Sequence, residues 1–165
     1  LAGALVLTGP AAYLAPTWEL PALTDVATDP VSPPSFVFAT AERRPEDNPV
    51  RASTDSEAVA QLAAYPDIQP LRVSQPPDET HALVLQLAQA RGWRILDSGY
   101  TSRRVEAVAT SPVLKLVADV VIEVTADGSG TRVDMRSTSR TGRRDFGENA
   151  ARIRAFLADL AAAAR

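Results

Sequence analysis

ADVVIEVTADGSGTRVDMRSTS, residues 118–139, has the pattern of a β-hairpin. Two runs that alternate apolar and polar residues, 118–125 and 131–139, flank the turn sequence ADGSG. Successive side chains of a strand lie on opposite faces of a sheet. One face of the predicted hairpin therefore carries apolar residues and should cover the core: Val120, Ile122, Val124, Val133 and Met135.

The opposite face of the same strands is charged. If the ADGSG turn sets the register, Glu123 lies opposite Asp134, a repulsive pair that Arg132 and Arg136 are placed to relieve. Two interpretations are open: a solvated face held by cross-strand ion pairs, or a charged floor that binds a polar or anionic ligand. In the second, Arg136 is the anchor, because a guanidinium can hold a carboxylate or phosphate with two parallel bonds. The candidate ligand-binding residues are Arg136, Asp134, Asp119, Glu106 and Arg104.

The rest of the chain supplies elements that complete a sheet and cover it. Short strands are predicted over 71–74, 93–96 and 103–110, and a helix over 78–91 that Gly92 ends. A last amphipathic helix follows Asp145, which stands at capping-box spacing from Glu148. This order predicts an α+β two-layer sandwich, in which an antiparallel sheet of about four to five strands carries two main helices on one face. It is similar to the order in TATA-binding-protein-like and helix-grip folds.

A basic loop, Arg140 to Arg144, leads into that last helix. Gly142 suits a tight turn between strand and helix. Arg140, Arg143 and Arg144 are candidates for contact with an anionic surface such as acidic lipid head groups. The alternative is a solubilising loop whose arginines pair with Asp145 and Glu148.

The first 53 residues differ in composition from the remainder. Residues 1–16 are uncharged, and we expect the end of a transmembrane or signal segment there, with a buried apolar arm as the alternative. Residues 17–53 are rich in proline, and we predict a linker that wraps the domain of residues 54–165. We expect the linker to cling through Val31, Phe36, Val37 and Phe38. No Lys or Arg precedes Arg43, so the domain should lie on the non-cytoplasmic side.

A short helix is predicted over residues 54–64 at the start of the domain. Asp55 or Ser56 is placed to cap it. Val59, Leu62 and Ala63 share one face, which we expect to be buried.

Composition narrows the classes of function. A chain of 165 residues with 45% hydrophobic content is long enough for one domain with a real core. A net charge of −3 argues against a nucleic-acid partner. The absence of cysteine excludes disulfides, thiolate metal sites and cysteine nucleophiles.

Catalytic motifs find little support in the sequence. The single histidine, His81, is expected to face solvent or to cap its helix, and no nucleophile-elbow or phosphate-loop pattern occurs. No cofactor or metal is implied.

Several blocks together resemble the bacterial and plastid family known as domain of unknown function 1499. They are AYPDIQPL (64–71), GW (92–93), VEA (105–107), DVVIEV (119–124) and RVDMRSTSRTGRRDFGENAARIRAFL (132–157). The resemblance covers about residues 24 to 160, and family members often carry hydrophobic segments ahead of the domain. No activity is established for the family, so the resemblance implies an architecture rather than a mechanism.

The sequence therefore predicts a membrane-anchored domain of the cell envelope, on the periplasmic or another non-cytoplasmic side. We expect a non-catalytic binding or accessory module for a partner protein, a lipid or a small amphipathic ligand. The alternative is a hydrolase-like or lyase-like enzyme that uses the charged sheet face.

Overall fold

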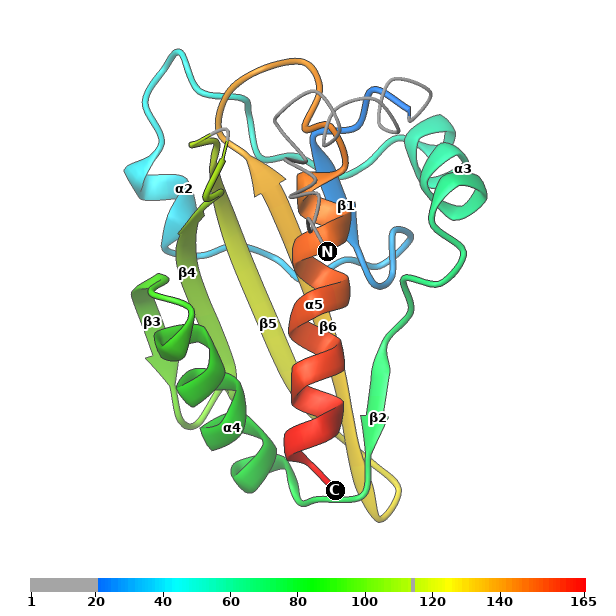
Figure 1. The fold of residues 1–165 in the computed structure, drawn as a ribbon, viewed down its shortest axis with the longest axis vertical. Coiled ribbons are helices and arrows are strands. Elements are labelled where there is room, and N and C mark those ends of the chain that lie inside the picture. Colours follow the sequence, from blue (N-terminus) through cyan, green and yellow to red (C-terminus); the bar gives the residue numbers. More distant parts are fainter. Residues whose placement is uncertain (1–20, 114) are drawn as a thin grey trace, which may run out of the picture.

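The computed structural model describes residues 21–113 and 115–165, which form an α+β two-layer sandwich (Figure 1). Six antiparallel strands make one sheet: β1 (Asp25–Ala27), β2 (Leu71–Val73), β3 (Arg94–Gly99), β4 (Arg104–Thr110), β5 (Val117–Asp127) and β6 (Gly130–Ser139). Their order is β1-β6-β5-β4-β3, and β2 pairs with β6 beside β1. The helices are α2 (Ala39–Glu42), α3 (Asp55–Ala64), α4 (Pro77–Ala90) and α5 (Glu148–Ala163). The predicted fold class is confirmed, with one strand more than expected.

The hairpin of β5 and β6 has the predicted register. Glu123 is paired with Asp134 across the two strands. Arg132 holds Asp134 at 2.6 Å, and Arg104 holds Glu123 at 3.2 Å, so each carboxylate has its own cation. The like-charge pair is thereby neutralised by neighbours on the same face of the sheet.

The core lies between the sheet and the two long helices, α4 and α5, which cross one face (Figure 1). Val120, Ile122 and Met135 point into it from the hairpin, as the alternation predicts. Ile153, Phe156 and Leu160 of α5 are fully buried against them. Trp93 stacks on Phe156 at 5.3 Å between ring centroids and closes the layer at the β3 side.

The proline-rich segment is more than a linker, because residues 25–27 form β1 and pair with β6. Residues 29–53, which we call the strap, then cross the sheet face opposite α4 and α5. Phe36 is half-buried and lies under the Arg136 guanidinium at 5.2 Å. Val31, Val37 and Phe38 are exposed, so the expectation that they hold the strap down is wrong. Polar contacts hold it instead.

Helix α3 packs with the opposite side from the one predicted. Thr54 caps it and forms a capping box with Glu57. Ala58 and Gln61 are buried, whereas Val59 and Leu62 are exposed. The side-chain amide of Gln61 exchanges two hydrogen bonds with the backbone of Ala27, at 3.0 and 2.7 Å. This pairing extends the edge of β1 and decides which side of the helix faces inward.

The last helix begins later than the capping pattern suggests. Gly147, with φ of 80°, precedes Glu148, the first residue of α5. The Asp145 carboxylate still accepts hydrogen bonds from the backbone N–H of Gly147 and Asn149. Gly142 has φ of 87°, which fits its predicted role in the turn.

None of the helices formed by residues 21–113 and 115–165 has both the length and the apolar character that crossing a bilayer requires. The predicted membrane or signal segment, residues 1–16, lies outside the described residues.

Candidate binding site

The strap is fastened to the charged sheet face at three places, of which the first is Glu106. Glu106 lies in the middle of β4 and its side chain is fully buried. Its carboxylate accepts hydrogen bonds from the backbone N–H groups of Val37, Phe38 and Ala39, at 2.7, 2.9 and 3.0 Å. Ala39 is the first residue of α2, Phe38 is its N-cap and Val37 precedes the cap, so no carbonyl of the helix can satisfy these N–H groups. The buried Glu106 carboxylate therefore supplies the acceptors that the N–H groups at the start of α2 lack, and these N–H groups supply its donors.

The second fastening is Arg136 of β6, which is 4% exposed. Its guanidinium holds both oxygens of Asp25, at 2.9 and 2.7 Å. It also donates to the carbonyl oxygens of Pro34 and Arg51, at 3.2 and 2.7 Å. One side chain thus joins β6 to β1 and to both ends of the strap.

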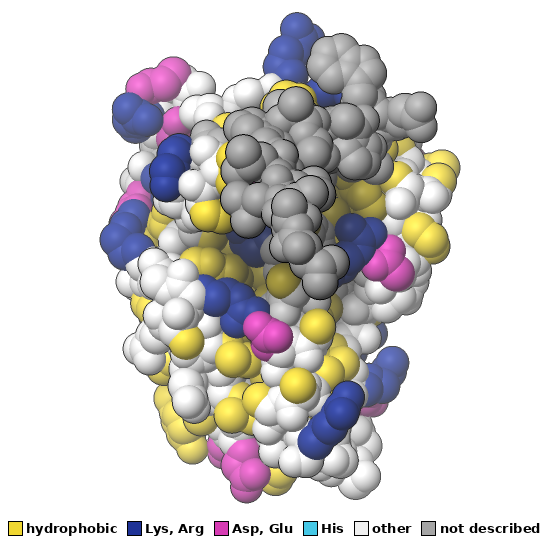
Figure 2. All heavy atoms as spheres, viewed as in Figure 1, with side chains coloured by type: hydrophobic (Ala, Val, Ile, Leu, Met, Phe, Trp, Pro, Cys, Tyr) yellow, Lys and Arg dark blue, Asp and Glu magenta, His cyan; other side chains and the backbone are white. Residues whose placement is uncertain are grey.

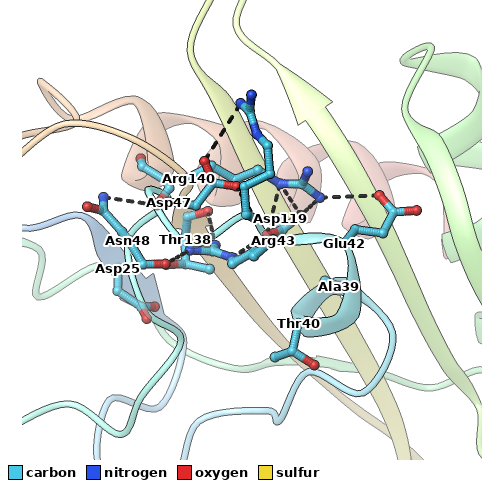
Figure 3. A network of polar contacts seen from close by, with 12 residues as sticks. Asp25, Ala39, Thr40, Glu42, Arg43, Asp47, Asn48, Asp119, Thr138 and Arg140 are labelled. Atoms are coloured by element: carbon cyan, nitrogen blue, oxygen red, sulfur yellow. Dashed lines mark hydrogen bonds and ion pairs between the residues drawn. The ribbon is translucent and has the colours of Figure 1, made fainter.

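The third fastening is a network around Asp119, drawn in Figure 3. Asp119 is fully buried and accepts from Arg43 of the strap at 2.8 Å and from Arg140 at 2.7 Å. Arg140 continues to Glu42 at 3.4 Å, and Glu42 also pairs with Arg94 of β3. The hydrogen bond from Arg94, with help from Arg140, lowers the pKa of Glu42 to about 2. The network extends from β6 across the sheet to its outer strand.

The structure brings the predicted ligand-binding residues together on one face and gives each a partner within the chain. Asp119, Glu106 and Arg136 lie under the strap, while Asp134 and Arg104 are partly exposed at its margin. The Glu106 and Asp119 carboxylates already accept three hydrogen bonds each or more. Carboxylates so occupied and so buried stabilise the strap, and they offer no free oxygen to act as a base.

Beside the strap lies a pocket of about 400 Å³, where β1, α3 and the loop after β6 meet. Its lining is mainly polar and includes Asp25, Asn48, Arg51, Ser53, Glu57, Gln61, Thr138 and Arg143. The sequence predicts only Arg143 of this set. Thr138 comes from β6, and the others come from the proline-rich segment and from α3, where no local pattern predicts which side chains converge.

Most charges around the pocket are already balanced. Arg51 holds both oxygens of Glu57, at 2.8 and 2.6 Å, and this hydrogen bonding lowers the pKa of Glu57 to about 2. Asp25 is held by Arg136. Arg143 is exposed, and it makes no hydrogen bond or ion pair with any other residue that the structure describes. Arg143 is therefore the one cationic side chain of the pocket that is available to a ligand in the described structure.

The basic loop does not act as a unit. Arg140 is used in the Asp119 network and Arg144 also has a partner, so of the three loop arginines only Arg143 has a guanidinium without a partner among the described residues. On the face seen in Figure 2, Lys and Arg side chains are scattered among acidic ones and form no broad basic stripe.

His81 does not face solvent as expected. It is 3% exposed on α4, with its ring edge-on to Tyr100 at 6.3 Å. Its Nε2 has no hydrogen-bond partner among the described residues. Within the same residues, no group of three or more His, Asp or Glu side chains is placed to hold a metal ion.

Comparison with known proteins gives a family and nothing more specific. Residues 25–160 match the model of the family described as "Protein of unknown function (DUF1499)". The search of curated proteins found no match. The family match covers the sheet, the strap, α3, α4 and most of α5. It includes most of the residues that line the pocket, while Leu23 and Thr24 lie just before it.

Proposed function

The chain belongs to the DUF1499 family, and we propose that it is a membrane-anchored, non-catalytic binding domain. In this proposal the polar pocket accepts the anionic group of a small ligand, a phosphate or a carboxylate. The observation that carries it is Arg143, the one pocket cation with no partner in the described structure. A guanidinium is suited to either group, because it donates two parallel hydrogen bonds.

The surroundings of Arg143 support a site that exists before the ligand arrives. Asn48 of the strap holds the loop after β6 by two hydrogen bonds. Its backbone N–H donates to the carbonyl oxygen of Arg140 at 2.6 Å, and its side-chain amide donates to the carbonyl oxygen of Gly142 at 2.8 Å. Arg140 is held in turn by Asp119. Because the loop is fixed at Arg140 and at Gly142, directly before Arg143, binding has little backbone to order.

The neighbouring groups favour a ligand with few charges. Around the pocket, Arg51 is neutralised by Glu57, and Asp25 by Arg136. Only Arg143 leaves a net positive charge, so a single carboxylate or phosphate group fits better than a polyanion. Ser53, Thr138 and Gln61 add uncharged polar atoms that can bind hydroxyl groups of the same ligand.

Membrane anchoring and a non-cytoplasmic position are part of the proposal and come from the sequence. Residues 1–18 carry no charge, and no Lys or Arg precedes Arg43. The chain has no cysteine, so Ser32→Cys introduces a unique thiol at an exposed strap position. A membrane-impermeant maleimide should label it in intact spheroplasts. Labelling only after lysis would place the domain in the cytoplasm instead.

Binding is tested by calorimetry on the full chain with three probes: inorganic phosphate, glycerol 1-phosphate and acetate. We expect at least one to bind, and Arg143→Ala to weaken it about tenfold or more, since a charge-assisted hydrogen bond contributes about 1.5–3 kcal/mol. Arg44→Ala is the matched control, because Arg44 is also an exposed arginine, on the strap, but does not line the pocket. Binding that Arg143→Ala leaves unchanged, or no binding of any probe at millimolar concentration, would refute the proposed site.

A further inference from the structure

Two carboxylates in the wall of the Arg143 pocket, those of Asp25 and Glu57, can accept further hydrogen bonds. The Asp25 side chain is 23% exposed, and each of its oxygens accepts one hydrogen bond from Arg136, at 2.9 and 2.7 Å. The Glu57 side chain is 37% exposed, and its Oε1 accepts one hydrogen bond, from Arg51 at 2.6 Å. Because a carboxylate oxygen can accept two hydrogen bonds, both Asp25 oxygens and Glu57 Oε1 can each take a donor from a ligand.

Hydroxyl groups of the protein lie beside these acceptors. Thr138 is directly opposite Asp25 in the pairing of β1 with β6, and opposed residues of neighbouring strands have their side chains on the same face of the sheet. Both residues line the pocket and are labelled in Figure 3, and Ser53 of the strap lines it as well. The wall therefore combines groups that only accept hydrogen bonds with hydroxyls that donate and accept. The hydroxyl groups of a ligand can bind to both kinds.

The two carboxylates are held in position by the protein itself. Arg136 fixes Asp25 by its two parallel hydrogen bonds. The capping box with Thr54 fixes Glu57 at the start of α3. A ligand therefore meets acceptors that need little ordering, which favours binding.

The charges of the pocket distinguish hydroxyl groups from an ammonium group as the donors of the ligand. Three arginines and two carboxylates lie in the wall or directly behind it, which leaves a charge of +1: Arg51, Arg136 and Arg143 against Asp25 and Glu57. A ligand with one carboxylate and several hydroxyls balances this charge. An amino acid has no net charge, and a phosphate group carries more than one negative charge.

We propose that the pocket binds a sugar acid, a uronate, with its carboxylate on Arg143 and its hydroxyls on the carboxylates of Asp25 and Glu57. This inference rests on the binding site proposed above and names the class of its ligand. The volume of about 400 Å³ is near the lower end of the range for small-molecule sites, about 300–1,000 Å³, and suits a single sugar ring. The mainly polar lining agrees with a hydroxylated ligand rather than an acyl chain.

Calorimetry on the full chain compares ligands that differ in one kind of group. Glucuronate and galacturonate carry the carboxylate and the hydroxyls, acetate only the carboxylate, glucose only the hydroxyls, and glycine a carboxylate with an ammonium group. We expect at least one uronate to bind about tenfold or more tightly than acetate and glucose. Its methyl glycoside then identifies the source: equally tight binding would indicate a uronate at the end of a polysaccharide, and weaker binding the free monosaccharide.

Two variants test the acceptors. Asp25→Asn should weaken uronate binding about tenfold or more, whereas acetate should bind equally or more tightly because a negative charge is removed. Since Asp25 also holds Arg136, thermal unfolding must first show that this variant is folded. Glu57→Gln is the second variant, because glutamine keeps the capping box, and it should weaken uronate binding about threefold or more. Asp127→Asn is the matched control, since this carboxylate pairs with Arg72 but does not line the pocket, and it should change neither affinity.

The outcomes separate the two proposals. If none of acetate, phosphate and the uronates binds, the site proposed above fails, and the sugar acid fails with it. If acetate or phosphate binds but neither uronate binds more tightly than acetate, only the class of ligand is wrong. Tighter binding of glycine than of both uronates would also overturn it, because the carboxylates would then hold an ammonium group. So would a preference for uronate that persists unchanged in Glu57→Gln and in folded Asp25→Asn.

Discussion

Replacing Glu106 by Gln should detach the strap near α2. The substitution keeps the size of the side chain but removes its charge and one of its two acceptor oxygens. In the native chain the two oxygens accept three N–H donors, Val37 at one and Phe38 and Ala39 at the other. In the variant the amide oxygen can satisfy two donors at most, and the amide NH₂ group must face the third.

The magnitude follows from these contacts. A hydrogen bond to a buried charged group contributes about 1.5–3 kcal/mol, and a neutral one about 1 kcal/mol. Three charged bonds are replaced by two neutral ones and a donor facing a donor, while the carboxylate no longer has to be kept dry. We expect a net loss of about 3 kcal/mol in the free energy of unfolding. For a domain of this size that corresponds to a fall in Tm of about 6–12 °C.

Chemical denaturation at pH 7 measures the loss, and hydrogen exchange locates it. The amides of Val37, Phe38 and Ala39 should exchange much faster in Glu106→Gln than in the native protein. Glu123→Gln is the matched control, because Glu123 is 31% exposed and makes one ion pair with Arg104. It should cost about 0–1 kcal/mol. Equal losses in the two variants, or fast exchange of these amides in the native protein, would refute the role of Glu106.

Three further predictions concern the strap, the edge of the sheet and acid stability. Arg136→Ala should cost about 3–5 kcal/mol in denaturation, because it leaves Asp25 and two carbonyl groups without their donor, whereas Arg72→Ala should cost less than about 1 kcal/mol. Gly130→Ala should lower the free energy of unfolding by about 1–3 kcal/mol, measured from the fall in Tm, because a Cβ there would overlap the Val73 carbonyl oxygen. The pKa of Glu57 and of Glu42 lies at about 2 in the fold, against 4.5 normally, so their contribution is complete above about pH 4.5 and disappears toward pH 2. Denaturation at a series of pH values should show this fall, with a shallower slope in Glu57→Gln.

The sequence predicts the sheet hairpin well because both signals there are local. Alternation assigns each residue of 118–125 and 131–139 to a face, and the short turn between them leaves one register, with Glu123 opposite Asp134. The long helices are equally visible from their apolar spacing. These elements need no knowledge of distant parts of the chain.

The position of the strap could not be predicted in this way, because the residues that hold it are far away in sequence. Arg136 and Asp25 are 111 residues apart, and Glu106 is 67 to 69 residues from the amides it accepts. Nothing in a proline-rich run indicates which carboxylate will meet its N–H groups. The charged face was therefore open to two interpretations, a solvated surface or a ligand-binding floor, and neither anticipated that the chain itself would cover it.

The inversion of α3 has a related cause. Judged by hydrophobicity alone, Val59 and Leu62 should be buried and Gln61 exposed. A single tertiary contact, the pairing of Gln61 with the Ala27 backbone, outweighs that pattern. The same contact places Glu57 and Gln61 at the pocket, so the site too depends on a pairing that no local signal predicts.

The pairing of β1 with β6 also sets an order of events during synthesis. Residues 25–53 leave the ribosome early, but β6 and Arg140, which receive β1 and the strap, leave it about a hundred residues later. Until then the strap has no sheet to cross, and the carboxylates of β4 and β5 have no cover. Folding is therefore completed from the C-terminal end, and a chain interrupted before β6 exposes the edge of β5, where another strand can add.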